Sequence, residues 1–236
     1  MGRFFSTVVI VAVFLGLIYG MHYGFYSLLS RQGMFDLRDI RVSGNGMLKA
    51  SDIIQGSGLV YGQSIFSINL AAVSKNILAD RMVQSAVVTL LPPDRVDIKV
   101  EERKPAAVVS MDNNYYVCDK DGFIIENGVI STIPHVVIDF QTGIEANQLK
   151  NDYLLAVIAN LAEFADSSEL KSLIVKQKEG LFITVRGCED TTFYAGNNIP
   201  DDAMFKKVLV IAKKIKSDKM SIKYIDMNKD NVIGFK

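Results

Sequence analysis

Two glycines flank an asparagine in residues 41–54, RVSGNGMLKASDII, between a strand-like run and an apolar helical pattern. A strand, a glycine loop and a helix in this order can cradle a phosphate, because free backbone N–H groups point at the anion. Residues 44–49 read GNGMLK, however, and lack the third glycine of the GxGxxG fingerprint, and no GxxxxGK[ST] loop occurs. These glycines are therefore predicted to form a tight turn.

Acidic residues in DMNKDNVIGFK are spaced like the start of a calcium loop, with Asp226, Asn228 and Asp230 at alternate positions. The sixth residue of such a loop is glycine, and here it is Asn231; the bidentate glutamate of the loop is also missing. We interpret the segment as a polar turn between two strands, and predict no metal and no cofactor.

Signatures of catalysis are missing as well. No GxSxG or HExxH occurs, and only His135 remains for a catalytic triad because His22 lies in an apolar segment. Glu101 and Glu102 are adjacent at a predicted strand end, where solvated charges are ordinary. An enzyme is therefore the weaker hypothesis, and no catalytic residue is predicted.

The composition limits the remaining classes. Lysine plus arginine equals aspartate plus glutamate, 26 each, so no basic field is available for nucleic acid. The two cysteines, Cys118 and Cys188, lie in no CxxC motif and exclude a disulfide framework. They form either one bridge in an oxidising compartment or, the reading we favour, two separate thiols.

Residues 4–29 are predicted to be a transmembrane helix after a short cytoplasmic tail of residues 1–3. No Asp, Glu, Lys or Arg occurs between Arg3 and Arg31, a length sufficient to cross about 30 Å of hydrocarbon as a helix. Tyrosines cluster toward its C-terminal end, as in an interfacial aromatic belt. A cleaved signal peptide is the alternative, but it requires a shorter apolar region and a small-x-small cleavage site.

The next 75 residues or so read as strand, helix, helix, strand, strand. FDLRDIRV precedes the glycine turn, and Asn69 is a candidate N-cap for the second helix. QSAVVTLL is apolar on both faces, as expected of a covered central strand. After a turn at Pro92-Pro93-Asp94, VDIKVEE alternates between apolar and charged residues, which indicates a half-buried strand.

The remainder is predicted to be rich in strands. YYVC and FIIE form a hairpin around Asp119–Gly122, and a helix is expected over about 145–165. Strands follow around 171–177, 181–186 and 191–195, then a helix after Pro200 and two terminal strands, SIKYIDM and NVIGFK. The predicted fold class is α+β.

These patterns resemble the FtsQ/DivIB family of bitopic bacterial cell-division proteins. The resemblance covers nearly the whole chain and is strongest over 35–109, in FDLRDIRVSGN, GQSIFSIN and VVTLLPPDRVDIKVEERKPAAVV. The matching residues are Val42, Gly44, Gly62, Ile65, Phe66, Leu91, Pro92, Val96, Ile98, Val100, Glu102, Arg103, Pro105 and Ala107. The resemblance implies a POTRA domain over 35–105 and an FtsQ-type β domain over 106–236.

The same resemblance implies a non-enzymatic scaffold that links early and late division proteins and helps to control septal peptidoglycan synthesis. It implies an inner-membrane protein with its bulk in the periplasm, binding FtsB and FtsL, and other divisome proteins through the POTRA and transmembrane segments. A strand of FtsB would add to the last edge strand. The implied partner-binding residues are Tyr224, Ile225, Met227, Val232, Ile233, Gly234 and Phe235.

Another POTRA protein, for outer-membrane assembly or secretion, is the alternative. Such proteins carry a transmembrane β-barrel after their POTRA units, and the roughly 125 residues after residue 109, with two predicted helices, are too few and too helical for it.

Overall fold

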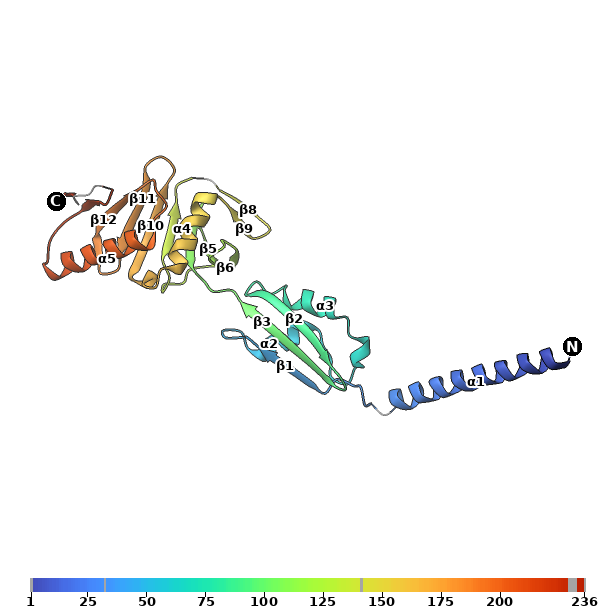
Figure 1. Cartoon of the computed structure of the whole chain (residues 1–236). Coiled ribbons are helices and arrows are strands. Elements are labelled where there is room, and N and C mark those ends of the chain that lie inside the picture. The colour runs from blue at the N-terminus through green and yellow to red at the C-terminus, as the bar shows by residue number, and fades with distance from the viewer. Residues whose placement is uncertain (1, 32, 141, 229–232, 236) are drawn as a thin grey trace. The chain divides into compact units, whose positions relative to one another are not determined.

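The computed structural model describes residues 2–31, 33–140, 142–228 and 233–235 (Figure 1). Side chains are described for residues 10–25 and 27 of the first helix, and only the backbone is described for the last strand. The chain divides into two compact units, Met1–Glu102 and Arg103–Lys236. Each unit is described by itself.

The first helix, α1, spans Gly2–Arg31. Its side chains from residue 10 to residue 25 are all exposed. Among the helices that the structure describes, none is both long and apolar enough to cross a membrane. The transmembrane assignment of residues 4–29 thus stays a prediction.

The rest of unit 1 is a three-stranded sheet with two helices. Its elements are β1 (Asp39–Ser43), α2 (Ala50–Ser57), the 3-10 helix η1 (Ile65–Ser67), α3 (Leu70–Ile77), β2 (Val83–Leu91) and β3 (Arg95–Glu102). The strand order is β1-β3-β2, with β1 parallel and β2 antiparallel to β3. The predicted order of strand, helix, helix, strand and strand is confirmed.

Local sequence signals set these elements. The side chain of Asn69 accepts a hydrogen bond from the N–H of Ala72, so the predicted N-cap of α3 is confirmed. Along β3, the alternation of VDIKVEE buries Val96, Ile98 and Val100 against the helices. One apolar core results, to which α2 and α3 contribute Ile53, Val73 and Ile77.

The prediction that QSAVVTLL is a covered central strand is wrong. This segment forms most of β2, which is an edge strand, and β3 is the central one. Ser85, Val87 and Thr89 are exposed on the outer face, with Val87 59% exposed. The outward position of Val87 is apolar, and a valine tolerates exposure on a pleated surface. The sequence of β2 therefore does not show a clear alternation of apolar and polar residues.

Unit 2 is built on a nine-stranded sheet. Its strands are β4 (Ala107–Met111), β5 (Asn114–Cys118), β6 (Ile124–Asn127), β7 (His135–Ile138), β10 (Leu170–Lys176), β11 (Gly180–Val185), β12 (Cys188–Gly196), β13 (Tyr224–Asp226) and β14 (Ile233–Phe235). The order is β14-β13-β12-β11-β10-β7-β4-β5-β6. A small hairpin, β8 (Gly143–Glu145) and β9 (Gln148–Lys150), forms a separate sheet. The α+β fold class is confirmed.

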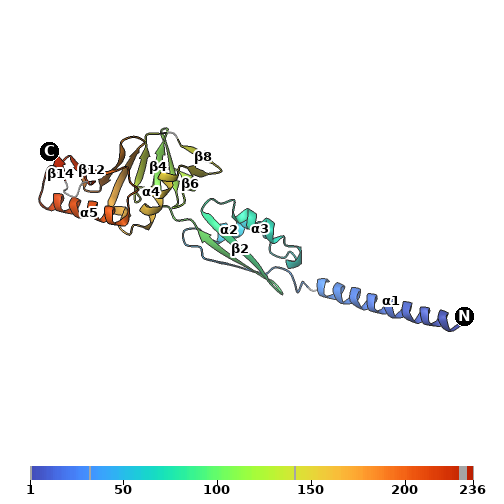
Figure 2. The same cartoon turned by 45° about the horizontal axis from the view of Figure 1, so that its top comes forward.

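Two helices, α4 (Asp152–Glu163) and α5 (Asp202–Ser217), pack on one face of this sheet (Figure 2). The strands contribute Val136, Leu173, Ile183, Phe193 and Ile225, which share one face by their register and join the helices in a single core. Phe164 and Phe205 stack within it, with ring centroids 5.2 Å apart. The predicted helix over about 145–165 is shorter than expected, because β9 occupies its first residues.

Candidate partner-binding edge

The last two strands form one edge of the nine-stranded sheet. β13 and β14 are antiparallel, and β14 is the outermost strand at this edge within the described residues. The paired residues are Tyr224 with Phe235, Ile225 with Gly234, and Asp226 with Ile233. The chain therefore has a short strand at this edge of the sheet.

β13 is fixed from its other side by β12, which runs parallel to it. The N–H of Met227 donates to the carbonyl of Tyr194 at 2.9 Å, and the N–H of Thr192 donates to the carbonyl of Lys223 at 2.9 Å. The hydroxyl of Thr191 donates to the carbonyl of Ile222 at 2.6 Å. Backbone and side-chain hydrogen bonds between β12 and the residues that flank β13 therefore fix β13, the strand with which β14 pairs.

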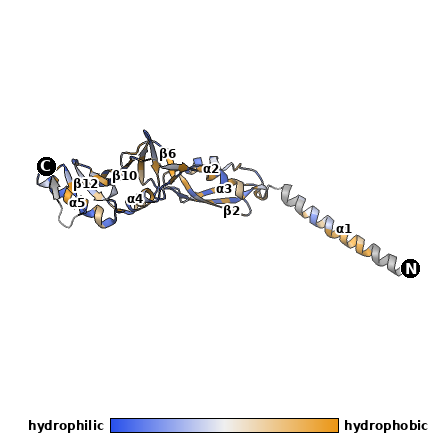
Figure 3. Cartoon of the chain, turned by 90° about the horizontal axis from the view of Figure 1, so that it is seen from above, coloured by the Kyte–Doolittle hydropathy of each residue, from blue (hydrophilic) through white to orange (hydrophobic). Residues whose placement is uncertain are grey.

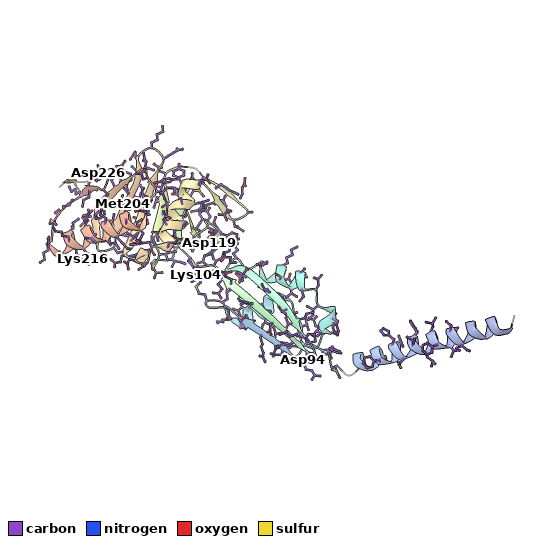
Figure 4. All side chains as sticks on the ribbon, viewed as in Figure 1. Asp94, Lys104, Asp119, Met204, Lys216 and Asp226 are labelled. Carbon is purple, nitrogen blue, oxygen red and sulfur yellow. The ribbon has the colours of Figure 1, made fainter. Side chains whose placement is uncertain are left out.

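A polar turn starts directly after β13. The N–H of Asn228 donates to Oδ1 of Asp226 at 3.0 Å, as in an Asx turn (Asp226 is labelled in Figure 4). Asn228 lies against Gly196, which has φ +76°; a Cβ on that glycine would come within 2.0 Å of the Asn228 amide nitrogen. Residues 229–232 lie outside the described residues, and Val232 with them.

The described residues among the predicted partner-binding set divide into three groups. Ile225 and Met227 are 1% and 3% exposed and belong to the core, so the structure does not bring them to the surface. Tyr224 is half-buried on the opposite face of the sheet. For Ile233, Gly234 and Phe235 the backbone places the residues in β14.

An aromatic row crosses this second face, and the sequence reading missed it. The rings of Phe182 and Tyr194 are 5.2 Å apart, and those of Tyr194 and Tyr224 are 6.2 Å apart and close to parallel. Lys176 lies 5.2 Å from the Phe182 ring centroid. The outward aromatic positions of LFITV and TFYAG were the available signal, since in both segments an aromatic occupies a position between two buried residues.

The surroundings of Tyr224 are partly desolvated. Burial, then the charge of Asp226 and the neighbouring Tyr194, raise the pKa of the Tyr224 phenol above its ordinary value. The phenol is therefore neutral at physiological pH and keeps its O–H as a hydrogen-bond donor. An aromatic with an apolar body and a polar tip suits a protein interface.

The glycine turn near residue 45 does hold an anion, but it is a carboxylate of the same chain. The N–H groups of Gly46, Met47 and Leu48 donate to the Glu102 carboxylate at 2.8, 2.7 and 3.0 Å. Partial burial raises the pKa of Glu102, but the three N–H donors outweigh it and lower that pKa below the ordinary value. The interpretation of Glu102 as a solvated charge is wrong. The turn follows β1, which pairs with β3, so it reaches the end of β3 where Glu102 lies, and a sequence separation of more than 50 residues hides this contact.

The other candidates for chemistry, His135 and the two cysteines, pack against neighbouring residues of the fold. His135 is half-buried on β7 beside the ring of Tyr115, and burial together with the Arg186 charge lowers its pKa. Cys118 is buried and Cys188 half-buried, both as free thiols. Burial raises the pKa of the Cys118 thiol to about 12. In the described part of the chain, no three His, Cys, Asp or Glu residues are grouped so that they could hold a metal ion.

Comparison with known proteins agrees with this architecture. The family model "POTRA domain, FtsQ-type" matches residues 35–103. The cell division protein DivIB of Clostridium acetobutylicum is 33% identical over 92 residues, 39% of this chain and 37% of its own length. The cell division protein FtsQ of Rickettsia bellii is 27% identical over 120 residues, 50% of this chain and 45% of its own.

The matches span less than half of the relatives' own length in both cases. A solved structure, the major extracytoplasmic domain of DivIB from Geobacillus stearothermophilus, aligns with 51% of this chain and 98% of its own at 14% identity. Its TM-score of 0.33 is too low to compare the two folds in detail. The chain thus contains a POTRA domain of the FtsQ type and is similar over part of its length to cell division proteins named DivIB and FtsQ.

Proposed function

We propose that this chain is an essential scaffold of the bacterial division machinery, which links early and late division proteins and helps to control septal peptidoglycan synthesis. The FtsQ-type POTRA match carries this proposal, supported by relatives named as cell division proteins. The proposal includes no catalytic role, since His135 and the two cysteines pack against neighbouring residues of the fold.

The proposed location is the inner membrane at the division septum. Residues 4–29 would span the membrane with residues 1–3 in the cytoplasm, and the two units would lie in the periplasm. The sequence supports this with an uncharged run from residue 4 to residue 30. The side chains of α1 from residue 10 to residue 25 are exposed. Most of them are apolar, as the colouring by hydropathy shows (Figure 3). A helix that is apolar on all sides needs an apolar environment.

The proposed partners are FtsB and FtsL, bound at the edge that β14 forms. A strand of FtsB would add beyond β14, because the main chain of an outermost strand can pair with a further strand. Main-chain hydrogen bonds would supply adhesion and alternate side chains selectivity. Other divisome proteins would contact the POTRA domain and the transmembrane segment.

Residues of the edge would have separate tasks. Tyr224, Val232, Ile233, Gly234 and Phe235 would contact the partner, with Phe235 as the apolar anchor and Gly234 allowing close approach of the backbones. Ile225 and Met227 would act from the core by fixing β13. The aromatic row beside Tyr224 would extend the contact across the sheet face.

Ile233→Pro tests the edge-strand mechanism, because proline removes a main-chain donor from β14. We expect this variant of the full chain to lose FtsB binding in detergent, with near-ultraviolet circular dichroism unchanged. Glu126→Pro is the matched control, since Glu126 lies in β6, the strand at the opposite edge. Unchanged FtsB binding by a folded Ile233→Pro variant would disprove strand addition at β14.

A pull-down of the tagged full chain from its own membranes, read by mass spectrometry, tests the function as a whole. Recovery of FtsB and FtsL is expected. Recovery of barrel-assembly or secretion components in their place would retain the POTRA fold and exclude the division role.

A further inference from the structure

Unit 1 exposes apolar side chains at one end, which we call the apolar end and define by Met34, Phe35, Val60, Tyr61 and Phe66. Of the seven large apolar residues described as exposed between residues 33 and 102, four belong to it. Phe66 is 68% exposed and Val60 62%. Phe35 is half-buried beside them.

Backbone hydrogen bonds bring the two segments of the apolar end together. The N–H of Leu37 donates to the carbonyl of Gln63 at 2.8 Å, and the N–H of Gly62 donates back to Leu37 at 2.9 Å. The N–H of Ile65 donates to the carbonyl of Phe35 at 2.9 Å. The rings of Phe35 and Phe66 are consequently 5.0 Å apart.

The outward direction of Phe66 is fixed by its neighbour. Ile65 is fully buried in the core of unit 1, and both residues belong to the 3-10 helix η1. Because Ile65 points inward, Phe66 projects from the surface rather than filling the core. Phe66 is thus exposed because the packing of Ile65 fixes the backbone of η1 in this orientation.

The turn between β2 and β3 lies at the same end of the sheet. The carbonyl of Asp94 accepts hydrogen bonds from the N–H groups of Arg38 and Asp39 at 2.9 and 3.2 Å, at the point where β1 begins (Asp94 is labelled in Figure 4). The prolines Pro92 and Pro93 in this turn are exposed and uncharged. On the turn side, this end therefore presents two prolines beside the charged side chains of Arg38 and Asp94.

Chain length restricts how far this end can lie from α1. Met34 is three residues beyond Arg31, where α1 ends, and three extended residues span about 10 Å at most. The headgroup layer on each side of a bilayer is roughly 5–8 Å thick. If α1 spans the membrane, as proposed above, the apolar end is confined to the immediate neighbourhood of the lipid interface.

We infer that the apolar end inserts Phe66 and Tyr61 into the headgroup and acyl-chain boundary of the membrane, so that unit 1 is seated on the lipid. Tyrosine is favoured at this boundary because its apolar ring leaves water while its hydroxyl stays hydrated, and the phenylalanine ring adds apolar surface. This inference rests on the proposed membrane anchor. The apolar end is proposed to contact the lipid surface, and the test below also distinguishes a protein partner bound at the same residues.

The chain contains no tryptophan, so a single introduced tryptophan reports its own surroundings. We would reconstitute the full chain into vesicles of phosphatidylethanolamine and phosphatidylglycerol that contain doxyl-labelled lipid. Phe66→Trp is the probe and Tyr61→Trp the second probe. Val87→Trp is the matched control, because Val87 is 59% exposed on the outer face of β2 in the same unit.

We expect severalfold stronger lipid quenching of Phe66→Trp and Tyr61→Trp than of Val87→Trp. Leu15→Trp, within α1, separates the inference from the anchor. Quenching of Leu15→Trp with no excess quenching at positions 66 and 61 would retain the anchor and overturn the seating of unit 1, which is also the result expected if a protein covers this end. No quenching of Leu15→Trp would overturn both.

Discussion

Two turns of this chain each hold a carboxylate, one in each unit, and they do so with different strength. In unit 1, the Glu102 carboxylate accepts three N–H groups from residues 46–48. In unit 2, Oδ1 of Asp119 accepts the N–H groups of Asp121 and Phe123 at 3.0 and 2.9 Å (Asp119 is labelled in Figure 4). Both carboxylates replace water as the partner of turn N–H groups.

The difference lies in burial and in a cation. The Asp119 side chain is 5% exposed, and its other oxygen pairs with Arg103 at 2.6 Å. The Arg103 guanidinium also lies over the Phe123 ring, 3.8 Å from its centroid. A buried charge that loses its partner is costly, whereas a more accessible carboxylate can exchange its partners for water. We therefore expect Asp119 to contribute more to the free energy of unfolding of unit 2 than Glu102 contributes to that of unit 1.

Asp119→Ala is expected to have the largest effect. It leaves the half-buried Arg103 without its anion, and we expect the free energy of unfolding of unit 2 to fall by about 3 kcal/mol. Urea denaturation of the full chain measures the loss, and hydrogen exchange of β5 and β6 assigns it to this unit.

Asp121→Ala is the matched control for that variant. Asp121 pairs with Lys120 at 3.0 Å, but both side chains are more than half exposed. An exposed pair contributes about 0–1 kcal/mol, so this variant should be nearly neutral. Equal losses for the two aspartates would contradict the role of burial.

Gly44→Ala tests the geometry of the turn that holds Glu102. Gly44 has φ +83°, and a Cβ there would come within 2.0 Å of the carbonyl oxygen of Val100. We expect unit 1 to lose about 2–3 kcal/mol, from the left-handed backbone and the displacement of β3. Thermal unfolding of the full chain gives the comparison.

Gly56→Ala is the control for that substitution. Gly56 lies in α2, and a Cβ there meets nothing within 4 Å. Alanine should stabilise the helix by about 0.5–1 kcal/mol. A destabilised Gly56→Ala variant would show that any methyl group in this region is harmful.

Glu102→Gln should have a smaller effect. Glutamine keeps one oxygen, which can accept two of the three N–H groups, but it loses the charge and turns its NH2 group toward the third, so we expect a loss of about 1–2 kcal/mol from unit 1. Glu101→Gln, at the exposed neighbouring position, should change little. Equal stability of Glu102→Gln and the unchanged chain would mean that charge adds nothing to the turn.

The smallest expected effect is a pH dependence of unit 1. The pKa of Glu102 is lower in the folded state, so its stabilisation is present above the ordinary carboxyl pKa of about 4.3 and is lost as pH falls through the folded value. Acid titration of hydrogen-exchange protection in residues 46–48 should show this loss, and Glu102→Gln should remove it. A loss of protection on raising the pH would contradict the sign.

Several elements could be predicted from the sequence because their signals are local. The alternation of VDIKVEE and the N-cap at Asn69 depend on residues that are close neighbours in the sequence. The hairpin of β5 and β6 around Asp119–Gly122 was predictable for the same reason. The terminal strands of the candidate edge were also read correctly as strands.

What remained hidden depends on contacts distant in sequence. The order of strands made β2 an edge rather than a central strand, and no pattern within QSAVVTLL records which strand lies beside it. The aromatic row of Phe182, Tyr194 and Tyr224 exists only because β11, β12 and β13 align in one register.

The sequence by itself determined the α+β class, the positions of most strands and helices, and the resemblance to a division protein. The tertiary structure alone decided which residues face outward at the edge, burying Ile225 and Met227 while leaving Tyr224 half-exposed. It also decided that the glycine turn binds Glu102. The physical reason is that burial and ion pairing are set by neighbours in space, and only the folded sheet brings residues 46 and 102 together.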